Sequence, residues 1–246
     1  MRFRNIINRA FWTLSLLVVC AIWNSAQAQY PHGATGLLTI PTADMQSDGT
    51  FMSGVNYMPE YITPSAWNYD TANYFFNMTI LPFFEVNYLC TVFKFTNGVI
   101  NQDRALMARI RVLEEKSWYP SIVIGTSDAM SLSQDNTNPL ESVSGNRYYG
   151  GVYGVATKHF NLGRELVGVT VGYNHKTQEK SYKDGLFYGV SYNPGFCRDL
   201  TCMADYSSDI VSVGAAIKLF NHFSLHAYCY DFKAFAGGVR YEVKLY

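Results

Sequence analysis

The sequence predicts an all-β protein: a single transmembrane antiparallel β-barrel of about twelve strands. Three observations support this prediction. Apolar and polar positions alternate in segments of about ten residues up to Tyr246. Short and long joints between these segments also alternate, and the chain begins with features of an export signal. Because side chains alternate across a strand, each segment has one apolar and one polar face.

Residues 1–28 have the three parts of a cleavable signal peptide. The positive region contains Arg2, Arg4 and Arg9, and the apolar run covers 11–23. The small residues of the cleavage site are Ala26 and Ala28. The apolar run is shorter than the roughly 20 residues that a transmembrane helix needs. Bulky Val19 disfavours the alternative of a lipid-modified Cys20. We therefore expect export to the outer membrane of a Gram-negative bacterium.

Residues 29–48 form a short N-terminal segment ahead of the barrel, which we expect at 49–246. The stretch Gly-Leu-Leu-Thr-Ile-Pro-Thr-Ala at 36–43 is strand-like. Pro41 interrupts it, because proline has no N–H to donate to a strand ladder. We expect this stretch in the periplasm, either at the barrel mouth or folded into the lumen. The alternative is a thirteenth or irregular edge strand.

The barrel strands follow from the alternation, with turn-forming residues between them. They are expected at about 50–60, 72–81, 83–95, 103–115, 119–129, 146–160, 164–177, 184–193, 199–207, 209–220, 222–232 and 235–246. Alternate joints are tight, whereas the others include the longer polar ones at 61–71, 96–102, 130–145 and 178–183. Bacterial barrels have short periplasmic turns and longer external loops. We therefore expect both termini on the periplasmic side.

The composition fits such a barrel. Aromatic residues make up 16% of the chain, including 19 tyrosines, and only 15% of the residues are charged. Tyrosine and tryptophan favour the two membrane interfaces. The formal net charge is zero, so nothing indicates nucleic acid as a partner. The expected partners of the fold itself are outer-membrane lipid and the barrel-assembly machinery.

Charged side chains fall on the polar phase of the strands and so should line the lumen. The candidates for lumen lining or glycan contact are Glu85, Arg109, Arg111, Lys218, Arg240, Glu242 and Lys244. Such a mixed lining could guide an anionic glycan. The alternative, which we favour, is that opposite charges pair and fill a narrow barrel, because a buried charge needs compensation. No cofactor is expected.

The cysteines indicate no metal site. Cys197 and Cys202 flank a turn closely enough to form a disulfide in an oxidising periplasm, and two free thiols are the alternative. No histidine lies at ligand spacing from this pair. Cys90 and Cys229 fall on the lipid-facing phase, where cysteine acts as a small hydrophobe.

Catalysis is not expected. A hydrolase needs a nucleophile, a base and a group that orients the base. The histidines considered for such a role are His175, near an external strand end, and His226, with Ser224 on the same face. Isolated polar residues of this kind usually line a lumen. The acidic residues Asp128, Asp135 and Glu141 around the longest loop match no calcium motif in their spacing.

Several short motifs follow one another along most of the mature chain. They are 36–43, 103–104, 109–115, 119–120, 125–128, 153–160 and 204–209. As an ordered set they resemble the YjbH-like family of outer-membrane proteins linked to exopolysaccharide production. The residues that represent the motifs are Gly36, Pro41, Thr42, Ala43, Asp128, Lys158 and Asp205. Their alternative role is structural, in fixing a turn and sealing the periplasmic mouth.

The resemblance implies an outer-membrane barrel that supports assembly, secretion or surface retention of a capsule or other extracellular polysaccharide, without catalysis. It implies the polysaccharide and the periplasmic exopolysaccharide machinery as partners. Two alternatives belong to other classes. One is a lipid- or glycan-modifying outer-membrane enzyme, and the other is a structural or porin-like barrel.

Overall fold

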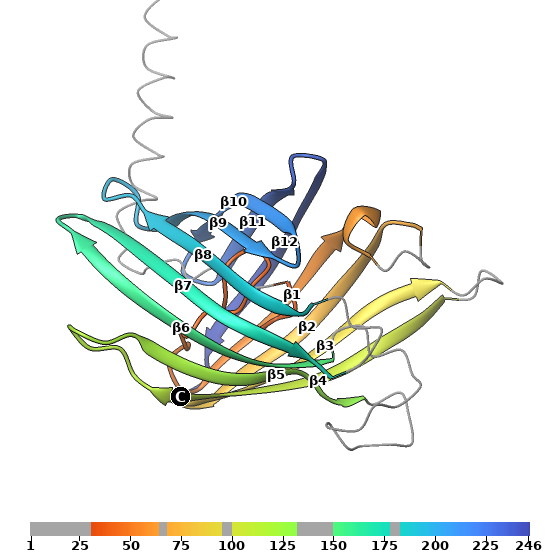
Figure 1. The fold of residues 1–246 in the computed structure, drawn as a ribbon, viewed down its shortest axis with the longest axis horizontal. Coiled ribbons are helices and arrows are strands. Elements are labelled where there is room, and N and C mark those ends of the chain that lie inside the picture. Colours follow the sequence, from red (N-terminus) through yellow and green to blue (C-terminus); the bar gives the residue numbers. More distant parts are fainter. Residues whose placement is uncertain (1–30, 64–67, 95–99, 132–149, 178–182) are drawn as a thin grey trace, which may run out of the picture.

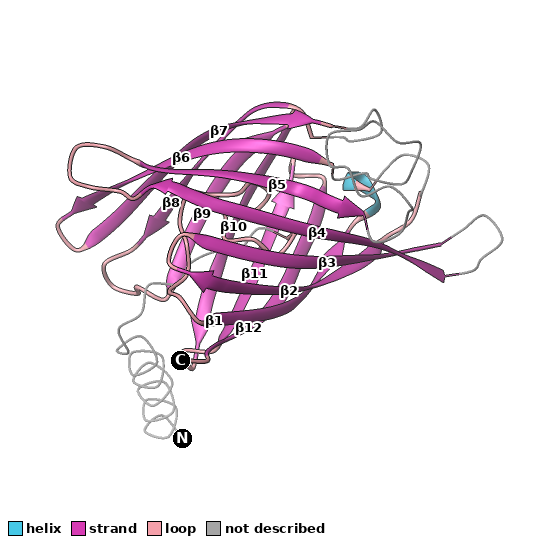
Figure 2. Ribbon diagram, turned by 90° about the horizontal axis from the view of Figure 1, so that it is seen from below, coloured by secondary structure: helices cyan, strands magenta, loops and turns pink. Residues whose placement is uncertain are grey.

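In a computed structural model, the chain forms a closed antiparallel β-barrel (Figures 1 and 2). The structure describes residues 31–63, 68–94, 100–131, 150–177 and 183–246. Within them the strands are β1 (Thr50–Met58), β2 (Thr71–Leu81), β3 (Phe84–Lys94), β4 (Ile100–Leu113), β5 (Ser121–Ser131), β6 (Gly151–Leu162), β7 (Glu165–Lys176), β8 (Gly185–Asn193), β9 (Leu200–Ser207), β10 (Ile210–Leu219), β11 (Phe223–Tyr230) and β12 (Ala234–Lys244). The predicted fold class is confirmed.

Closure joins the first strand to the last. Each strand pairs with its neighbours in the sequence, and β1 also pairs with β12 in register from Thr50 opposite Lys244 to Tyr57 opposite Gly237. A closed sheet has no edge, so its backbone donors and acceptors are paired within the sheet. This pairing is the requirement that a protein must meet in order to cross a lipid bilayer with strands.

The twelve predicted strands all correspond to observed ones among the described residues. Most ends agree to within a few residues, and 146–149 of the expected sixth strand lie outside the described residues. Register shifts within the pairing of β4 with β5 mark the irregularities that the alternation alone does not predict.

The joints separate into two ends of the barrel. The turns β2–β3, β4–β5, β6–β7, β8–β9 and β10–β11, together with the C-terminus, lie at one end, which we call the short-turn end. The opposite end is called the long-loop end. Three hairpins close with adjacent residues of positive φ, Ser208–Asp209, Phe220–Asn221 and Asp231–Phe232. Tight turns of this kind match the twist of the flanking strands, and Asn and Asp tolerate the conformation.

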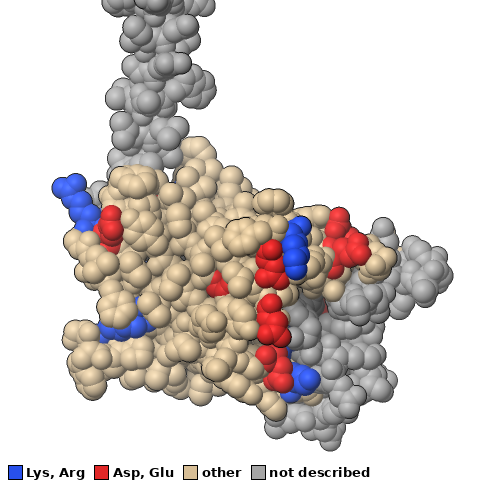
Figure 3. All heavy atoms as spheres, turned by 45° about the horizontal axis from the view of Figure 1, so that its top comes forward, with Lys and Arg blue, Asp and Glu red and all other residues tan. Residues whose placement is uncertain are grey.

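The outward face of the barrel is apolar. Large hydrophobic residues exposed on the strands include Val55, Phe76, Ile124, Val152, Val169, Val171, Tyr188, Val190, Val213, Leu225 and Val239. Figure 3 shows one face on which Lys, Arg, Asp and Glu gather mainly toward the margins, with a broad area largely free of charge between them. Among the described residues no helix is both long and apolar enough to span a membrane; the only helical element is the 3-10 turn η1 (Glu60–Ile62).

The N-terminal segment lies inside the barrel. Residues 31–43 are all buried, and we call 31–48 the plug segment. It adds no thirteenth strand: the segment contains isolated bridges, such as the one between Gly36 and Pro41, and no strand precedes β1 among the described residues. Of the locations that the sequence left open, the lumen is the one observed.

Candidate functional site

The core of the site is a tight hairpin within the plug segment. Thr42 N donates to Thr35 O at 3.3 Å, and Leu37 N donates to Ile40 O at 2.9 Å. These bonds pair two short arms around Leu38 and Thr39, and we call residues 35–42 the plug hairpin. Pro41 fits because it donates to no strand of the barrel, which explains why the strand-like motif does not join the sheet.

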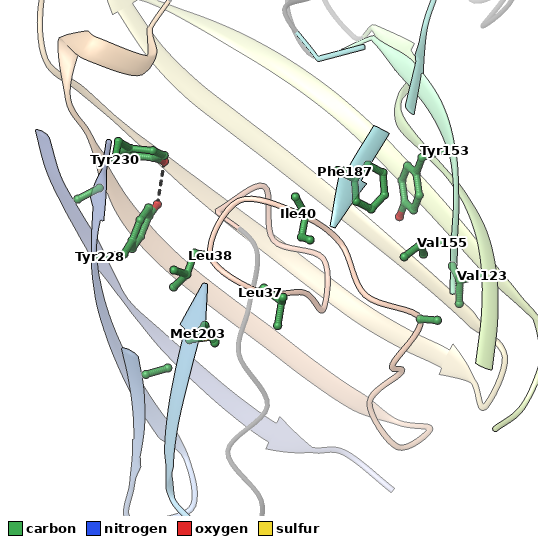
Figure 4. Close-up of a cluster of buried hydrophobic side chains, with 13 residues drawn as sticks. Leu37, Leu38, Ile40, Val123, Tyr153, Val155, Phe187, Met203, Tyr228 and Tyr230 are labelled. Atoms are coloured by element: carbon green, nitrogen blue, oxygen red, sulfur yellow. Dashed lines mark hydrogen bonds between the residues drawn. The ribbon is translucent and has the colours of Figure 1, made fainter. Parts of the chain in front are cut away.

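Apolar contacts hold the hairpin against the barrel wall. Leu37, Leu38 and Ile40 are almost fully buried and belong to one hydrophobic cluster. Figure 4 shows their side chains projecting from the central loop into the lumen. The barrel residues of the cluster are Val123, Tyr153, Val155, Phe187, Met203, Ala216, Tyr228, Tyr230 and Ala236. They come from strands on several sides of the lumen, so the hairpin fills its middle.

Asp205 of β9 binds the tip of the hairpin. Its Oδ2 accepts hydrogen bonds from Leu38 N and Thr39 N, both at 2.8 Å, and its Oδ1 accepts one from Thr39 Oγ1 at 2.6 Å. Lys183, from the β7–β8 loop at the long-loop end, donates through Nζ to Thr39 O at 2.5 Å. The tip therefore points toward the long-loop end and is held from both its donor and its acceptor sides.

Arg109 of β4 binds the base of the hairpin. Its Nη1 donates to Thr35 O and Thr42 O, both at 2.9 Å, and its Nη2 donates to Asp44 O. Glu85 of β3 pairs with the same guanidinium at 3.1 Å and accepts from Thr35 N and Thr35 Oγ1 at 3.2 Å each. Both charges are nearly fully buried, and their mutual pairing and hydrogen bonds compensate that burial.

Asparagines line the wall beside the first residues of the plug segment. Asn56 Nδ2 donates to Pro31 O at 2.9 Å, and Asn77 Nδ2 donates to Gly33 O at 2.9 Å. Asn87 Nδ2 donates to the carbonyl of the intervening residue, His32. A fourth amide belongs to the same group, because Asn56 also donates to Asn73 Oδ1 at 2.7 Å. We call Asn56, Asn73, Asn77 and Asn87, on β1 to β3, the amide wall.

A further set of contacts ties the end of the plug segment to the short-turn end. Ala43 N donates to Thr157 Oγ1 at 2.9 Å, and Ser121 Oγ donates to Ala43 O at 3.0 Å. Beside them Glu115 forms an ion pair of 2.8 Å with Lys158 and accepts a 2.9 Å bond from His159 N. Burial raises the pKa of Glu115, but its hydrogen bonds to Lys158 and His159 outweigh burial and hold the pKa below its usual value.

Two basic groups around the plug segment have lowered pKa values. Burial, and then the charge of Lys183, holds the pKa of His32 well below its usual value. Burial lowers the pKa of Lys183 to about 7, against the opposing effect of the Asp205 carboxylate. Both shifts have the same physical origin, since a charged group loses hydration in the lumen.

The predicted lumen charges fall into two paired groups. Glu85 and Arg109 form the first. In the second, Arg240 pairs with Glu242 at 3.0 Å, and Lys218 also contacts Glu242. The two remaining candidates lie at the short-turn end instead. Arg111 donates to Pro82 O at 2.8 Å, and Lys244 is exposed, because the strands end there and the side chains leave the lumen.

Six of the seven family-motif residues lie in or beside the plug segment. The segment itself contains Gly36, Pro41, Thr42 and Ala43. Asp205 binds the tip of its hairpin. Lys158 pairs with Glu115 and follows Thr157, which binds Ala43 N. Asp128 is buried on β5. The amide wall, Thr35, Thr39 and Lys183 were missed by the sequence analysis. Of these, only the asparagines form a recognisable sequence pattern, because they recur on the polar phase of neighbouring strands. The pattern is not specific, since an amide is common on any polar strand face.

No disulfide joins Cys197 and Cys202 in the structure, which corresponds to the second of the two alternatives left open by the sequence. Cys197 is buried in the β8–β9 turn, whereas Cys202 is exposed on β9. Cys90 lies on the outward phase as expected but is covered, next to the side chain of Tyr74.

The histidines considered for catalysis lie apart. His175 is exposed on β7, and Nε2 of His226 has no hydrogen-bond partner among the described residues. Ser224 instead accepts a 3.1 Å bond from Arg240. Asp135 and Glu141 lie outside the described residues.

Two small cavities lie beside the plug segment. One cavity of about 10 Å³ lies between Ala34, Asn87 and Tyr153, with further lining from β3 to β5. Another of about 30 Å³ lies at the long-loop end between Thr39, Ile62 and Lys183. Spaces of this size hold single water molecules, not a solute.

Comparison with known proteins gives one family. The YjbH family model, described as exopolysaccharide biosynthesis protein YbjH, matches residues 28–212. No curated protein matches the chain. Similar solved structures include outer membrane phospholipase A from Escherichia coli, with 10% identity and a TM-score of 0.33 over 81% of this chain and 98% of that chain. The calcium-bound outer membrane phospholipase dimer from Salmonella typhi has 10% identity and a TM-score of 0.32 over 78% of this chain and 88% of that chain.

Proposed function

We propose, because this chain belongs to the YjbH family of exopolysaccharide biosynthesis proteins, that it is an outer-membrane barrel supporting the assembly, secretion or surface retention of an extracellular polysaccharide. In this proposal the protein is not an enzyme. It acts as a scaffold or conduit whose lumen is closed at rest by the plug segment.

The outer-membrane location is supported by physical features of the barrel. The sheet is closed, its outward face carries large apolar side chains, and its buried charges are inside. Such a surface is stable in lipid and poorly suited to water. A signal peptide at 1–28 remains part of the proposal.

The single observation that carries the proposal is the binding of the plug segment by the family motifs themselves. Arg109 and Asp205 each make three hydrogen bonds to plug residues, from opposite ends of the hairpin. A general-diffusion porin needs an open lumen. The plugged lumen therefore favours a dedicated, closed barrel over a porin.

Deletion and complementation of the gene test this function. We expect a deletion strain to lose extracellular polysaccharide under inducing conditions, and the wild-type gene to restore it. A matched control is complementation with Asp209→Asn, which alters an exposed turn carboxylate that accepts a hydrogen bond from Tyr206 and makes no contact with the plug segment among the described residues. Unchanged polysaccharide in the deletion strain would contradict the proposal. Fractionation of the complemented strain tests the location, since recovery in the inner membrane or cytoplasm would exclude the outer membrane.

A further inference from the structure

The amide wall holds hydrogen-bonding capacity that the plug segment does not use. Asn56, Asn77 and Asn87 are at most 2% exposed, and each donates to a plug carbonyl. Their three Oδ1 atoms have no hydrogen-bond partner among the described residues. Leaving a buried acceptor unpaired costs about 1–3 kcal/mol, so such groups call for an explanation.

The unused acceptors follow from the chemistry of the present occupant. Residues 31–33 offer their carbonyls to the wall, and a carbonyl can only accept. A side-chain amide offers donors and an acceptor side by side. A hydroxyl group also both donates and accepts, so a polyhydroxylated chain matches such a wall better than the carbonyls of residues 31–33 do.

The charges of the lumen indicate that the polymer bound by the wall is uncharged. The buried ionisable residues of the strands comprise five carboxylates and two arginines: Glu85, Asp103, Asp128, Asp205, Glu242, Arg109 and Arg240. Both arginines are already paired with carboxylates. An anionic polymer entering this lumen meets five buried carboxylates, whereas Arg109, Arg240 and Lys218 already pair with carboxylates. The guidance of an anionic glycan, considered from the sequence, is therefore disfavoured.

The wall also has an apolar floor and room for a single chain. Phe75 of β2 is buried against Gly33, where it offers a ring to the C–H groups of a sugar. Residues 31–33 are a single backbone segment on the wall. Their release leaves space for one unbranched polymer strand.

We propose that the amide wall is a binding track for an uncharged, polyhydroxylated polymer strand, and that residues 31–33 occupy this track in the closed state. The proposal rests on the proposed function, because it identifies the polymer class that this barrel handles. Displacement of the plug segment and binding of the polymer are then competing events on one surface.

Gly33→Val offers a way to expose the wall without changing it. Gly33 has a φ of +90°, and a Cβ at this position meets Asn87 Oδ1 and Phe75 inside contact distance. Valine therefore forces residues 31–33 away from the track. Gly163→Val is the matched control, because Gly163 also has a positive φ, +71°, but has no atom within 4 Å of a Cβ.

The experiment uses full-length protein in detergent micelles or vesicles. Hydrogen exchange of the peptide containing residues 31–35 reports release from the wall, and calorimetry measures binding of maltohexaose, cellohexaose and isomaltohexaose. We expect Gly33→Val to bind at least one of these neutral sugars at least tenfold more tightly than wild type or Gly163→Val does. Adding Asn77→Leu and Asn87→Leu should abolish that gain.

Several results would overturn the proposal. One is rapid exchange at 31–35 in Gly33→Val without a gain in binding of any neutral sugar; another is equal or tighter binding of hexagalacturonate. If 31–35 stays protected, Asp205→Leu is added to release the hairpin tip, and the same criteria apply. The deletion strain reports the proposed function separately, so lost polysaccharide with no sugar binding contradicts the track alone.

Discussion

At the scale of single residues, two ionised side chains bind the plug segment by its backbone. Asp205 accepts from two plug N–H groups and one hydroxyl, and Arg109 donates to three plug carbonyls. Backbone groups are present whatever the side chains are, so these contacts recognise the path of the chain. Charge-assisted bonds of this type each contribute about 1.5–3 kcal/mol.

Replacing Asp205 tests the tip contact. Leucine has a similar size but no acceptor, so Asp205→Leu leaves Leu38 N and Thr39 N unpaired in the lumen. We expect plug docking to weaken by about 2–4 kcal/mol. Faster hydrogen exchange in residues 36–42 measures the loss, and Asp209→Asn at an exposed turn is the control. Exchange unchanged from wild type would show that Asp205 does not hold the tip.

The pKa of Lys183 predicts a pH dependence of plug docking. Lys183 has a pKa of about 7 in the docked state, against its usual 10.5 when released. Between these pH values the released state binds more protons, so raising the pH from about 7 to 10.5 favours docking. We expect slower exchange of residues 36–42 across this range after correction for intrinsic rates. Lys183→Met should flatten this part of the profile, and a wild-type profile that falls with pH would contradict the assignment.

At the scale of elements, the plug segment differs from every strand. Strands pair with their neighbours along the sheet, whereas the two arms of the plug hairpin pair with each other and are bound by side chains of the barrel. The barrel is closed without it, since β1 pairs with both β2 and β12. The segment thus lies inside a barrel whose sheet is complete without it.

Removal of residues 31–46 should therefore leave the barrel paired and open its lumen. We expect the shortened protein to keep the heat-modifiable migration of a folded barrel and to show stepwise conductance in planar bilayers, where the full-length protein is silent. Gly163→Val, in the exposed β6–β7 turn, is the control that keeps the plug segment intact. A folded but non-conducting shortened barrel would show that strand side chains alone close the lumen.

At the scale of the whole molecule, one face of the sheet contacts lipid in our proposal and the other contacts the plug segment. The outward face carries apolar side chains across its middle, and the lumen carries paired charges and amides. These two surfaces arise from the same strands, because alternate residues point in opposite directions.

A depth-dependent substitution tests the membrane position. Val171 is exposed near the middle of β7, and Leu162 is exposed at the end of β6. We expect Val171→Arg to lower the free energy of unfolding in lipid vesicles by about 2–4 kcal/mol, and Leu162→Arg by about 0–1 kcal/mol. Urea titrations measure both values. Equal losses would mean that the two sites share one environment and that no bilayer crosses the barrel there.

Much of the barrel follows from local patterns. The alternation around Val167 to Tyr173 and around Val239 to Leu245 predicts strands at β7 and β12, which the structure confirms. Such patterns can be recognised in a sequence because a strand presents its two faces within a few residues. Burial alone leads one to expect that the lumen charges are paired. It does not show which charge pairs with which, because Glu85 and Arg109 are 24 residues apart and meet only across β3 and β4.

The sequence by itself determined the class of fold, the number of strands and the two ends of the barrel, because alternation and turn chemistry are local properties of the chain. Tertiary structure decided where the strand-like motif at 36–43 lies and what holds it. Thr39 and Asp205 are separated by 166 residues, and they meet only after β9 has closed around the lumen. A contact over that distance depends on the geometry of the whole barrel, which no local pattern records.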